Sequence, residues 1–372
     1  MRIIHVINSL DDGGAEGALF RLVINNHESE NIVVSLRDIG KYGPLLKKNK
    51  IEVHTLEMQN NFGFFKGAYK LFFLFKNSKP DVVQTWMPHS DLLGGIIGKF
   101  AGVKKIFWGI RHSNLDYIKK NKRTRYLIKI NSFLSRFIPS GIVSCADTAE
   151  KYHRGIGFSS RNMTVIPNGF DFSYLKINNK FTKEFRSLNN IRNDVFLIGM
   201  VARYDPQKDH KNLLEALKII LNQKVNFLCI LVGKGLTIDN IEMLEQAKQM
   251  GVSENLLLFG QTENINYIMN VIDLHVLSSS YGEAFPNVII ESMACGTPCV
   301  ATDVGDSRQM IGNLGWIVDP KNPNQMANAI IDAYSNWKLG KDKENAQILR
   351  SFVKNKYDIG KMVNSFNNIW QS

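Results

Sequence analysis

The stretch YGEAFPNVIIESMACG, residues 281–296, places two glutamates eight positions apart around a proline, an asparagine and an apolar run. The proline suits the first turn of a helix and the closing glycine suits its end, so the stretch predicts a helix over about residues 287–295. Glu283 would then lie in the loop before this helix, and Glu291 one turn into it. Packing requires a carboxylate at neither position, which indicates a binding site.

The N-terminal N–H groups of such a helix can hold a phosphate, and a carboxylate on each side can accept hydrogen bonds from sugar hydroxyls. A sugar nucleotide carries hydroxyls on both sides of its diphosphate, on the ribose and on the transferred sugar. Phe285, Asn287 and Val288, which lie between the two glutamates, are expected to contact the same donor. The alternative is an ordinary carboxylate near a helix start together with a surface glutamate.

The rest of the chain alternates short β-branched runs with segments of helical spacing, which predicts βαβ units and parallel sheets. In the first half the expected strands are Arg2–Ile7, Ile32–Ser35, Val53–Leu56, Asp81–Thr85, Ile106–Ile110 and Ile142–Cys145. A polar stretch then interrupts the pattern up to about residue 193. In the second half the expected strands are Val195–Val201, Phe227–Val232, Leu256–Phe259, Leu274–Leu277, Cys299–Ala301 and Trp316–Val318. The fold class is therefore α/β, with two Rossmann-like domains in tandem.

This pattern predicts a first domain over residues 1–167, a second over residues 168–350, and a C-terminal helix over residues 351–372 that packs back on the first domain. The helix would carry an apolar face made of Ile359, Met362, Val363, Phe366, Ile369 and Trp370. Ligands of open parallel sheets bind beyond the carboxyl ends of the strands. The site is therefore expected in the cleft between the two domains.

The composition is that of a globular protein, since 44% of the 372 residues are hydrophobic and 22% are charged. No segment approaches the roughly 20 uninterrupted apolar residues of a spanning helix. The N-terminus lacks the basic start and the cleavage site of a secretory signal. The four cysteines are scattered and form neither a disulfide framework nor a zinc pair: Cys145, Cys229, Cys295 and Cys299. A reducing cytoplasm is the expected compartment.

The charge of the chain is unevenly distributed. Residues 1–167 hold 25 Lys and Arg against 13 Asp and Glu, and residues 168–372 hold 21 against 21, so the whole net charge of +12 lies in the first half. Two basic amphipathic segments, Tyr117–Ile138 and Phe62–Phe75, predict peripheral contact with the anionic inner face of the plasma membrane. The alternative is that their apolar sides pack on the sheet and their lysines are solvated. No nucleic-acid-binding module is recognisable, so nucleic acid is not expected as a partner.

Two strand-to-helix loops carry further candidate binding groups. Gly13 and Gly14 follow the first strand and open a helix, where a backbone can approach an anion, although a tight turn would explain them equally well. Arg203 and Lys208 follow the first strand of the second half. Two cations in such a loop suit a diphosphate, and a pair of solvated surface cations is the alternative.

Together these motifs resemble the family-4 retaining glycosyltransferases of the GT-B fold, and the resemblance covers nearly the whole chain. The segments that carry it are Gly13–Glu16, Val165–Asp171, Val232–Gly235, Ser280–Pro298 and Ala301–Asp306. Ser280–Pro298 resembles the E-x7-E signature of the family, and Val165–Asp171 resembles the "IPNGVD" that opens its second domain. Two segments depart from the family pattern, because Lys234 stands where an acidic residue is more usual and Ala301–Asp306 differs from the commoner "GGxxE".

The resemblance implies that Glu291 binds the donor ribose, Glu283 the transferred sugar, and Arg203 and Lys208 the diphosphate. Gly233, in the glycine turn, belongs to the same donor site, which would lie in the second domain, whereas the first domain would bind the acceptor. Transfer would proceed with retention and without a metal or other cofactor. The chain also lacks any Asp-x-Asp, the usual carboxylate clamp for a metal–nucleotide complex. The expected donor is UDP-linked, and the expected acceptor is a lipid-linked or oligosaccharide chain of a surface polysaccharide.

His112, in the string RHSN after a first-domain strand, lies where the family often has an acceptor-side histidine, and we expect it to join the catalytic groups Glu283, Arg203 and Lys208. Arg111 or Ser113 could fill this acceptor role instead, and His89 is a further acceptor candidate after another strand. A purely structural histidine is the alternative reading of His112. Two rival functions remain open, a sugar-nucleotide epimerase of the same fold and a non-catalytic protein that binds nucleotide sugars.

Overall fold

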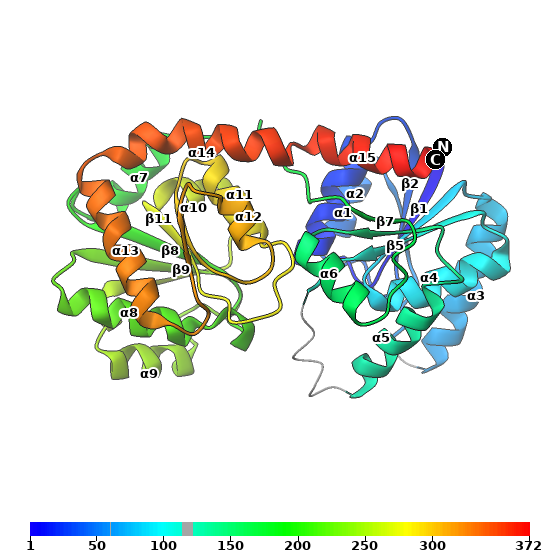
Figure 1. The fold of residues 1–372 in the computed structure, drawn as a ribbon, viewed down its shortest axis with the longest axis horizontal. Coiled ribbons are helices and arrows are strands. Elements are labelled where there is room, and N and C mark those ends of the chain that lie inside the picture. The colour runs from blue at the N-terminus through cyan, green and yellow to red at the C-terminus, as the bar shows by residue number, and fades with distance from the viewer. Residues whose placement is uncertain (60, 114–121) are drawn as a thin grey trace. The chain divides into compact units, whose positions relative to one another are not determined.

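The computed structural model describes residues 1–59, 61–113 and 122–372 of the chain, which divide into two compact domains (Figure 1). The first domain consists of Met1–Gly169 and Tyr357–Ser372, and the second of Phe170–Lys356. The sequence placed these two boundaries after residues 167 and 350. Both therefore lie a few residues further along the chain than expected.

The first domain is built on a parallel sheet with the strand order β3-β2-β1-β4-β5-β6-β7. Its strands are β1 (Arg2–Ile7), β2 (Glu30–Ser35), β3 (Glu52–Thr55), β4 (Val82–Trp86), β5 (Lys105–Ile110), β6 (Gly141–Ser144) and β7 (Met163–Val165). The central strands β1 and β4 are buried along almost their whole length because helices cover both faces of the sheet. The strand order reverses between β1 and β4, which makes the loops after these two strands the expected ligand site of this sheet.

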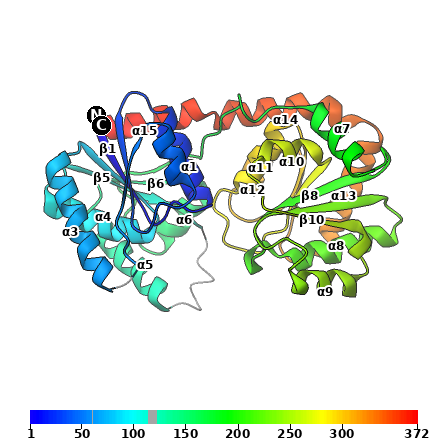
Figure 2. The same ribbon diagram turned by 180° about the vertical axis from the view of Figure 1, so that it is seen from behind.

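The helices of the first domain form two layers, one on each face of this sheet (Figures 1 and 2). One layer contains α1 (Gly14–Asn25), α2 (Tyr42–Lys48) and α15 (Ile359–Gln371). The other contains α3 (Asn61–Ser78), α4 (Pro88–Ala101) and α5 (Lys122–Leu134). A further helix, α6 (Asp147–Gly155), packs beside β7.

The second domain repeats this design with the strand order β10-β9-β8-β11-β12-β13. Its strands are β8 (Phe196–Val201), β9 (Phe227–Val232), β10 (Leu256–Gly260), β11 (Leu274–Leu277), β12 (Cys299–Thr302) and β13 (Trp316–Val318). The strand order reverses between β8 and β11, which pair in parallel. The loops that follow these two strands are therefore brought together at one edge of the sheet.

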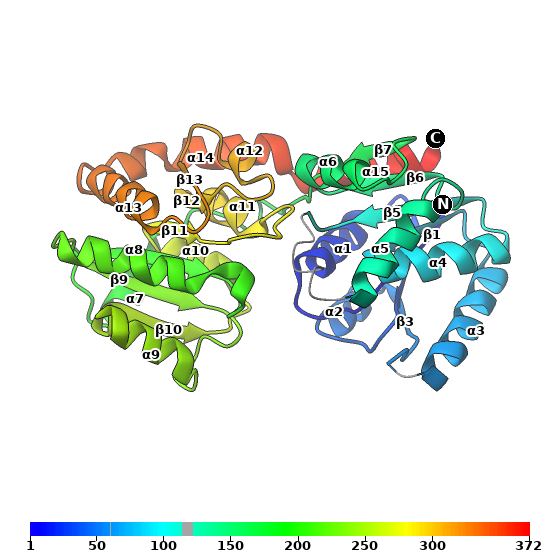
Figure 3. The same ribbon diagram turned by 60° about the horizontal axis from the view of Figure 1, so that its bottom comes forward.

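Helices also cover both faces of the second sheet (Figure 3). One layer contains α8 (His210–Asn222), α9 (Ile241–Met250) and α13 (Pro323–Lys338). The other contains α7 (Asn179–Leu188), α10 (Ile265–Val271), α11 (Asn287–Ala294) and α12 (Ser307–Ile311). The short turns η2 (Pro206–Lys208) and η3 (Ser253–Asn255) complete the loops, and α14 (Lys341–Tyr357) ends the domain. The predicted fold class, two Rossmann-like domains, is confirmed.

The C-terminal segment is two helices rather than the single helix expected over residues 351–372. The break lies at Asp358, whose backbone is extended and whose carboxylate caps α15 by accepting a hydrogen bond from the amide of Gly360. Beyond it, α15 buries Phe366 and Trp370 completely in the first domain, and the Trp370 indole donates to Gln84 at 3.2 Å. The predicted return of the chain to the first domain is thus made by α15.

Among the helices of the described residues, none combines the length and the apolarity that a bilayer crossing requires. The four cysteines are buried and form no disulfide.

Candidate functional site

A buried ion pair joins the two loops at the reversal point of the second sheet. Lys208 ends η2, in the loop after β8, and its ammonium donates to Oε1 of Glu283, in the loop after β11. The Ser279 hydroxyl donates to the same carboxylate oxygen at 2.7 Å. The side chains of Lys208 and Glu283 are only 14% and 11% exposed. The structure therefore brings together two of the predicted catalytic residues, in the region where ligands of such sheets bind.

The local sequence explains why these two loops meet. The carboxylate of Asp205 caps η2 by accepting from the amide of Gln207 at 2.9 Å. Asp209 adopts a left-handed backbone with φ 49° and caps α8 in the same way. From the loop after β11, the Ser278 hydroxyl donates to the carbonyl oxygen of Lys208 at 2.7 Å. The position of the Lys208 backbone is thus fixed from both loops.

Gly305 supports the Glu283 loop from behind. Its φ of 63° is left-handed, and a Cβ atom there would come within 2.6 Å of the carbonyl oxygens of Glu283 and Ala284. The amide of Asp306 donates to the Ala284 carbonyl at 3.0 Å. A glycine is therefore required after β12 so that the backbone of Glu283 can lie this close. Gly305 lies in the segment Ala301–Asp306, which departs from the family pattern.

The electrostatics of the pair keep Glu283 ionised. Burial alone would raise the pKa of this carboxyl, but the charge of Lys208 and the hydrogen bonds from Lys208 and Ser279 hold the pKa below its usual value. His210 adds no further positive charge beside Lys208, because burial, and then the charge of Lys208, lowers the pKa of its imidazole to about 4. The site thus holds a carboxylate and a paired ammonium at neutral pH.

Arg203 is the second cation at the carboxyl end of the second sheet, and it is more exposed than Lys208. Its Nε donates to Asp205 at 3.1 Å, and the side chain is 56% exposed. Gly233 makes room for this loop, since its φ is 148° and a Cβ atom there would collide with the carbonyl oxygen of Ala202. The amide of Tyr204 donates to the Lys234 carbonyl at 2.8 Å. Gly233 therefore has a demonstrated structural role, while its contact with a donor stays a prediction.

The predicted helix after Glu283 is confirmed as α11, which begins at Asn287. Pro286 stands at its N-cap rather than in its first turn, a shift of one residue from the expected position. Glu291 lies one turn into the helix and is half-buried. Burial, and then the charge of Glu291, raises the pKa of the Cys295 thiol to about 12.

The residues between the two glutamates differ in exposure. Asn287 and Val288 are half-buried, and Phe285 is buried. The start of α11 thus presents two partly accessible residues, whereas the preceding Phe285 is buried.

The first domain shows a comparable polar contact at its own reversal point. Asn8, after β1, accepts hydrogen bonds from the amide of Ser90 at 3.0 Å and from its hydroxyl at 2.7 Å, across the loop after β4. The side-chain amide nitrogen of Asn8 also lies 3.4 Å from Nδ1 of His89. Met87, which precedes them, has a φ of 77°, an unusual value for a residue with a side chain. The predicted acceptor residue His89 therefore lies in the first turn of α4, just after this constrained position.

The glycine loop before α1 already holds a carboxylate of its own. Gly13 is the N-cap of α1 and Gly14 its first residue. A Cβ atom on Gly13 would collide with the carboxylate of Glu16, which also accepts from the Ser9 hydroxyl at 3.4 Å. Burial raises the pKa of Glu16. Any anion at this helix start would have to approach an acidic side chain, and the predicted donor contact of Gly13 and Gly14 stays a prediction.

Arg111, directly after β5, is a half-buried cation whose Nε and Nη2 atoms are buried. Its guanidinium lies 4.1 Å from the ring centroid of Trp86, and Nη1 donates to Asn168 at 2.8 Å. Among the described residues, no hydrogen-bond acceptor meets its Nε or Nη2. Burial lowers its pKa to about 10, so the group stays charged at neutral pH. A charge held in this way is suited to an anionic partner.

His112 is neutral and packs against a second histidine. Its ring lies 5.0 Å from that of His153, centroid to centroid and edge to face. Burial, and then the neighbouring His153, lowers the pKa of His112 to about 3. At neutral pH this imidazole can exchange hydrogen bonds with a substrate hydroxyl but carries no charge. Ser113, the alternative acceptor residue, is buried.

Across residues 1–59, 61–113 and 122–372, no group of three or more His, Cys, Asp and Glu side chains is arranged to hold a metal ion.

Comparison with known proteins identifies the family of this chain. Residues 40–174 match the family model described as Glycosyltransferase Family 4, and residues 181–349 match the model described as Glycosyl transferases group 1. The chain belongs to the family-4 glycosyltransferases. The first match lies in the first domain except for its last few residues, and the second lies within the second domain, so the glycosyltransferase assignment rests on both domains.

Two relatives of this glycosyltransferase are named bacterial glycosyltransferases. It is 24% identical over 312 residues to the UDP-Gal:alpha-D-GlcNAc-diphosphoundecaprenol alpha-1,3-galactosyltransferase of Escherichia coli, covering 82% of this chain and 79% of that protein. It is 23% identical over 296 residues to the capsular polysaccharide biosynthesis glycosyltransferase CapM of Staphylococcus aureus, covering 76% and 75% of the two chains. The crystal structure of Anabaena Alr3699/HepE in complex with UDP and glucose superposes with a TM-score of 0.86 at 20% identity, covering 100% of both chains. This last likeness confirms the GT-B fold.

Sequence reasoning missed several residues that shape the glycosyltransferase site. Ser278 and Ser279 belong to a run of three serines directly after β11, a polar signal that could have been read as part of the site. Asn8 and Ser90 gave no comparable signal, because each is a single polar residue in a loop and their contact depends on the strand order. Gly305 could be predicted as a turn, but its close approach to Glu283 could not.

Proposed function

We propose that this glycosyltransferase moves a sugar, with retention at the anomeric carbon, from a UDP-linked donor to a hydroxyl of a lipid-linked or growing glycan in surface polysaccharide assembly. The observation that carries the proposal is the buried Lys208–Glu283 pair at the reversal point of the second sheet. The relatives support the choice of substrates. HepE was crystallised with UDP and glucose, and the E. coli relative is named for UDP-Gal and a diphosphoundecaprenol-linked sugar.

The donor is assigned to the second domain. Arg203 and Lys208 would bind the diphosphate, together with the N–H groups at the start of α11, where Asn287 and Val288 lie. Glu291, one turn into α11, would accept hydrogen bonds from the ribose. Glu283 would orient the transferred sugar through its hydroxyls. The exposed Arg203 can meet the diphosphate first, and the buried Lys208 can hold it once it is in place.

The chemistry follows from the charge that develops as the sugar–oxygen bond breaks. Negative charge grows on the leaving diphosphate, and fixed cations aimed at it stabilise the transition state more than the ground state. Arg203, Lys208 and the α11 N–H groups can perform this task. We therefore expect turnover to survive treatment with EDTA.

The acceptor is assigned to the first domain, where His89, Arg111 and His112 follow strands β4 and β5. The neutral imidazole of His112 suits an acceptor hydroxyl. The unsatisfied N–H groups of Arg111 suit an anionic group of the acceptor, such as the diphosphate of a lipid carrier.

A decisive test is to incubate the full chain with a panel of labelled nucleotide sugars, with and without a diphosphate-linked lipid sugar, and to read the products by NMR. Transfer that gives the same anomeric configuration as the donor supports the proposal. Isomerisation of the donor without an acceptor would identify the rival epimerase. Binding without any turnover across the panel would favour the non-catalytic rival.

The first domain also carries an exposed aromatic surface, which we call the aromatic face. Its members lie on α3, α4 and α5, and their side chains are between 61% and 78% exposed. They are Phe65, Tyr69, Phe100, Tyr126 and Phe133. α4 packs against both α3 and α5 (Figure 1). Lysines 66, 70 and 129 lie among the aromatic side chains in sequence. Aromatic groups within a basic domain suit the interface of an anionic membrane, and we assign the protein to the inner face of the plasma membrane as a peripheral protein.

Removing the aromatic face should release the protein from vesicles. We expect the Phe65→Ser, Tyr69→Ser, Phe133→Ser variant to co-sediment with phosphatidylglycerol vesicles at least about tenfold more weakly than the wild type, because burial of each ring contributes about 2 kcal/mol. Wild-type binding should also weaken as salt rises. Leu188→Ser with Ile238→Ser is the matched control, since both are 79% exposed in the second domain.

Equal binding of the wild type to neutral and anionic vesicles would count against the membrane assignment. The charge variant predicted from the sequence, Lys119, Lys120, Lys122 and Arg123 to Gln, should weaken binding as well. Of these four, Lys119 and Lys120 lie outside the described residues.

Glu291 provides the sharpest test of donor binding. Glu291→Ala should weaken affinity for the nucleotide sugar roughly 10- to 100-fold, because a hydrogen bond to a charged group contributes about 1.5–3 kcal/mol. The affinity can be measured by calorimetry. Glu245→Ala is a suitable control, since this glutamate lies exposed on α9. Equal affinity of wild type and Glu291→Ala would show that the ribose is bound elsewhere.

A further inference from the structure

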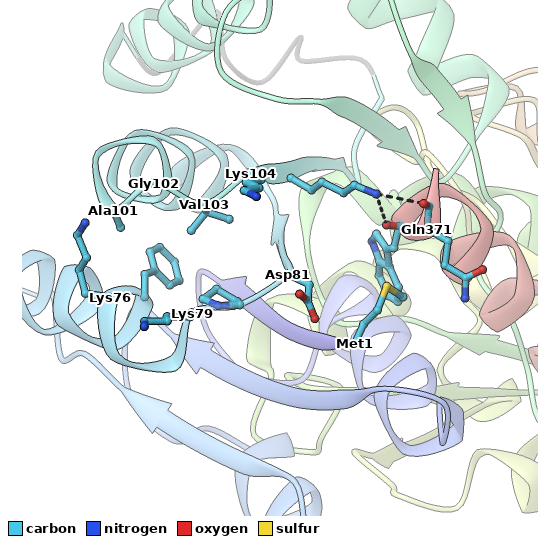
Figure 4. A pocket seen from close by; sticks show the side chains of 13 residues that line it. Met1, Lys76, Lys79, Asp81, Ala101, Gly102, Val103, Lys104 and Gln371 are labelled. Carbon is cyan, nitrogen blue, oxygen red and sulfur yellow. Dashed lines mark hydrogen bonds between the residues drawn. The ribbon is translucent and has the colours of Figure 1, made fainter.

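A cavity of about 750 Å³ opens at the amino ends of β1, β4 and β5 in the first domain (Figure 4). It lies at the edge of the sheet opposite to the loops that hold Asn8, His89 and Arg111. Its lining includes the buried side chains of Phe75 and Trp370. The volume is that of a small-molecule site, and none of the proposed donor or acceptor residues lines it.

The lining of this cavity is strongly basic. Four lysines contribute to it: Lys76, Lys79, Lys104 and Lys105. The only carboxylate in the lining is Asp81, and its Oδ2 already accepts the backbone amide of Arg2 at 2.8 Å. Such a set of like charges around one space repels itself unless an anion lies among them.

The lysines differ in what they already contact. Lys105 donates to the backbone carbonyls of Trp370 and Gln371 at 3.1 Å each, which ties down the end of α15, as the dashed lines in Figure 4 show. The ion pairs found among the described residues involve none of Lys76, Lys79 and Lys104. These three lysines thus line the cavity without a carboxylate partner among the described residues, and the Lys76 ammonium lies 5.8 Å from the ring centroid of Phe72.

Helix termini explain only part of this arrangement. Lys76 lies in the last turn of α3, where a cation complements the helix dipole. Lys79 is different, because it occupies the left-handed position after α3, with a φ of 45°. The equivalent position after α4 is taken by Gly102, with a φ of 83°, the residue type that this conformation favours. Lys104 precedes β5 and belongs to no helix. Lys79 and Lys104 therefore lie at the rim of the cavity, in positions where the dipole or the cap of a helix does not favour a lysine.

We propose that this cavity is a second anion site, which binds a phosphate-bearing ligand. Lys76, Lys79 and Lys104 bind the phosphate oxygens as point charges, and the side chain of Met1, which is 39% exposed, contacts the less polar part of the ligand. The phosphate can come from a soluble phosphorylated compound or from a phospholipid headgroup, since Phe100 of the aromatic face lies next to Ala101 of the lining. This site does not depend on the proposed sugar transfer.

The test uses the full chain and reads each lysine separately. Lysines are acylated with an amine-reactive reagent, and the modified sites are quantified by mass spectrometry without ligand, with pyrophosphate, and with phosphatidylglycerol or phosphatidylcholine vesicles. Residue-level readout keeps this cavity apart from any pyrophosphate bound at Lys208. The variant is Lys79→Gln with Lys104→Gln, and the matched control is Lys47→Gln with Lys48→Gln, an exposed pair on α2 of the same domain. Lys105 is left unchanged because it holds α15.

Pyrophosphate is expected to protect Lys76, Lys79 and Lys104 together, and in the Lys79→Gln, Lys104→Gln variant the midpoint for protecting Lys76 should rise at least about tenfold. The Lys47→Gln, Lys48→Gln control should leave it unchanged. Protection by phosphatidylglycerol vesicles alone, lost in the same variant, would identify the headgroup as the source. If neither probe protects the three lysines, or if both variants respond alike, the cavity is not an anion site.

Discussion

Replacing Lys208 with methionine is expected to lower the free energy of unfolding by about 3–5 kcal/mol, because it leaves the buried carboxylate of Glu283 without its cation. The Lys208→Met, Glu283→Gln double variant should recover most of this loss, since it removes the buried charge as well. Denaturant unfolding at pH 7 measures both. Lys211→Met is the control, because Lys211 pairs with Glu215 on the surface at 3.9 Å and is 67% exposed, so its loss should stay within about 0.5 kcal/mol.

The stability of the Lys208→Met variant should change with pH in the opposite sense to that of the wild type. In the wild type the pKa of Glu283 is lowered, so the stability it contributes is present above about pH 4.5 and is lost as pH falls through the lowered pKa. Without Lys208, burial dominates and the pKa rises, so the penalty at pH 7 should shrink as the carboxyl takes up a proton on acidification toward pH 5. A penalty in Lys208→Met that stays constant from pH 7 to pH 5 would show that Glu283 is not the group left unpaired.

Glu283→Gln should leave nucleotide binding nearly intact but slow sugar transfer by at least about 100-fold, the size of effect seen when one preorganised polar group is removed from a reacting centre. The glutamine oxygen can still accept from Lys208 and Ser279, so the loop should keep its position. What is lost is the negative charge beside the sugar, where positive charge develops as the leaving group departs. Turnover at saturating donor, with UDP affinity measured in parallel, separates the two effects.

The same transfer assay, run with the Arg203→Ala variant and with EDTA, tests the proposed role of the fixed cations. Arg203→Ala should lower turnover at saturating donor, while EDTA should not. Activity abolished by EDTA and restored by Mg²⁺ would overturn the proposed role of the fixed cations. Glu215→Gln, on the exposed face of α8, is the control for the loss of a carboxylate far from the chemistry.

Most of the fold could be predicted because each strand is a short apolar run bounded by turn residues. Phe227–Val232, Leu274–Leu277 and Trp316–Val318 were predicted to the residue. β7 was missed because it runs directly into the segment after Val165 where the strand pattern breaks. The break at Asp358 was missed because the apolar periodicity continues on both sides of it, so only the cap marks the new helix.

The site was predictable as a set of residues but not as an arrangement. The spacing in residues 281–296 indicated Glu283, and the loop cations indicated Lys208, yet their pairing depends on β8 and β11 being neighbours, which no local pattern encodes. The glycine loop shows the opposite case, because its sequence favours an anion while the structure places the Glu16 carboxylate there. The amphipathic segments likewise could not reveal which aromatic side chains face the sheet, as Phe75 does, and which face outward, as Phe65 does.

The return of α15 to the first domain has a consequence for synthesis on the ribosome. Phe366 stacks on Trp86 and Trp370 fills the space beside His5, and all of them are completely buried. The first domain therefore emerges with an open apolar groove, which closes only after the intervening residues 170–356 have been translated. The second domain is continuous in sequence and can complete its core earlier. A nascent chain stalled before residue 359 should thus hold a finished second domain and an unfinished first one, and it would need protection from aggregation during that interval.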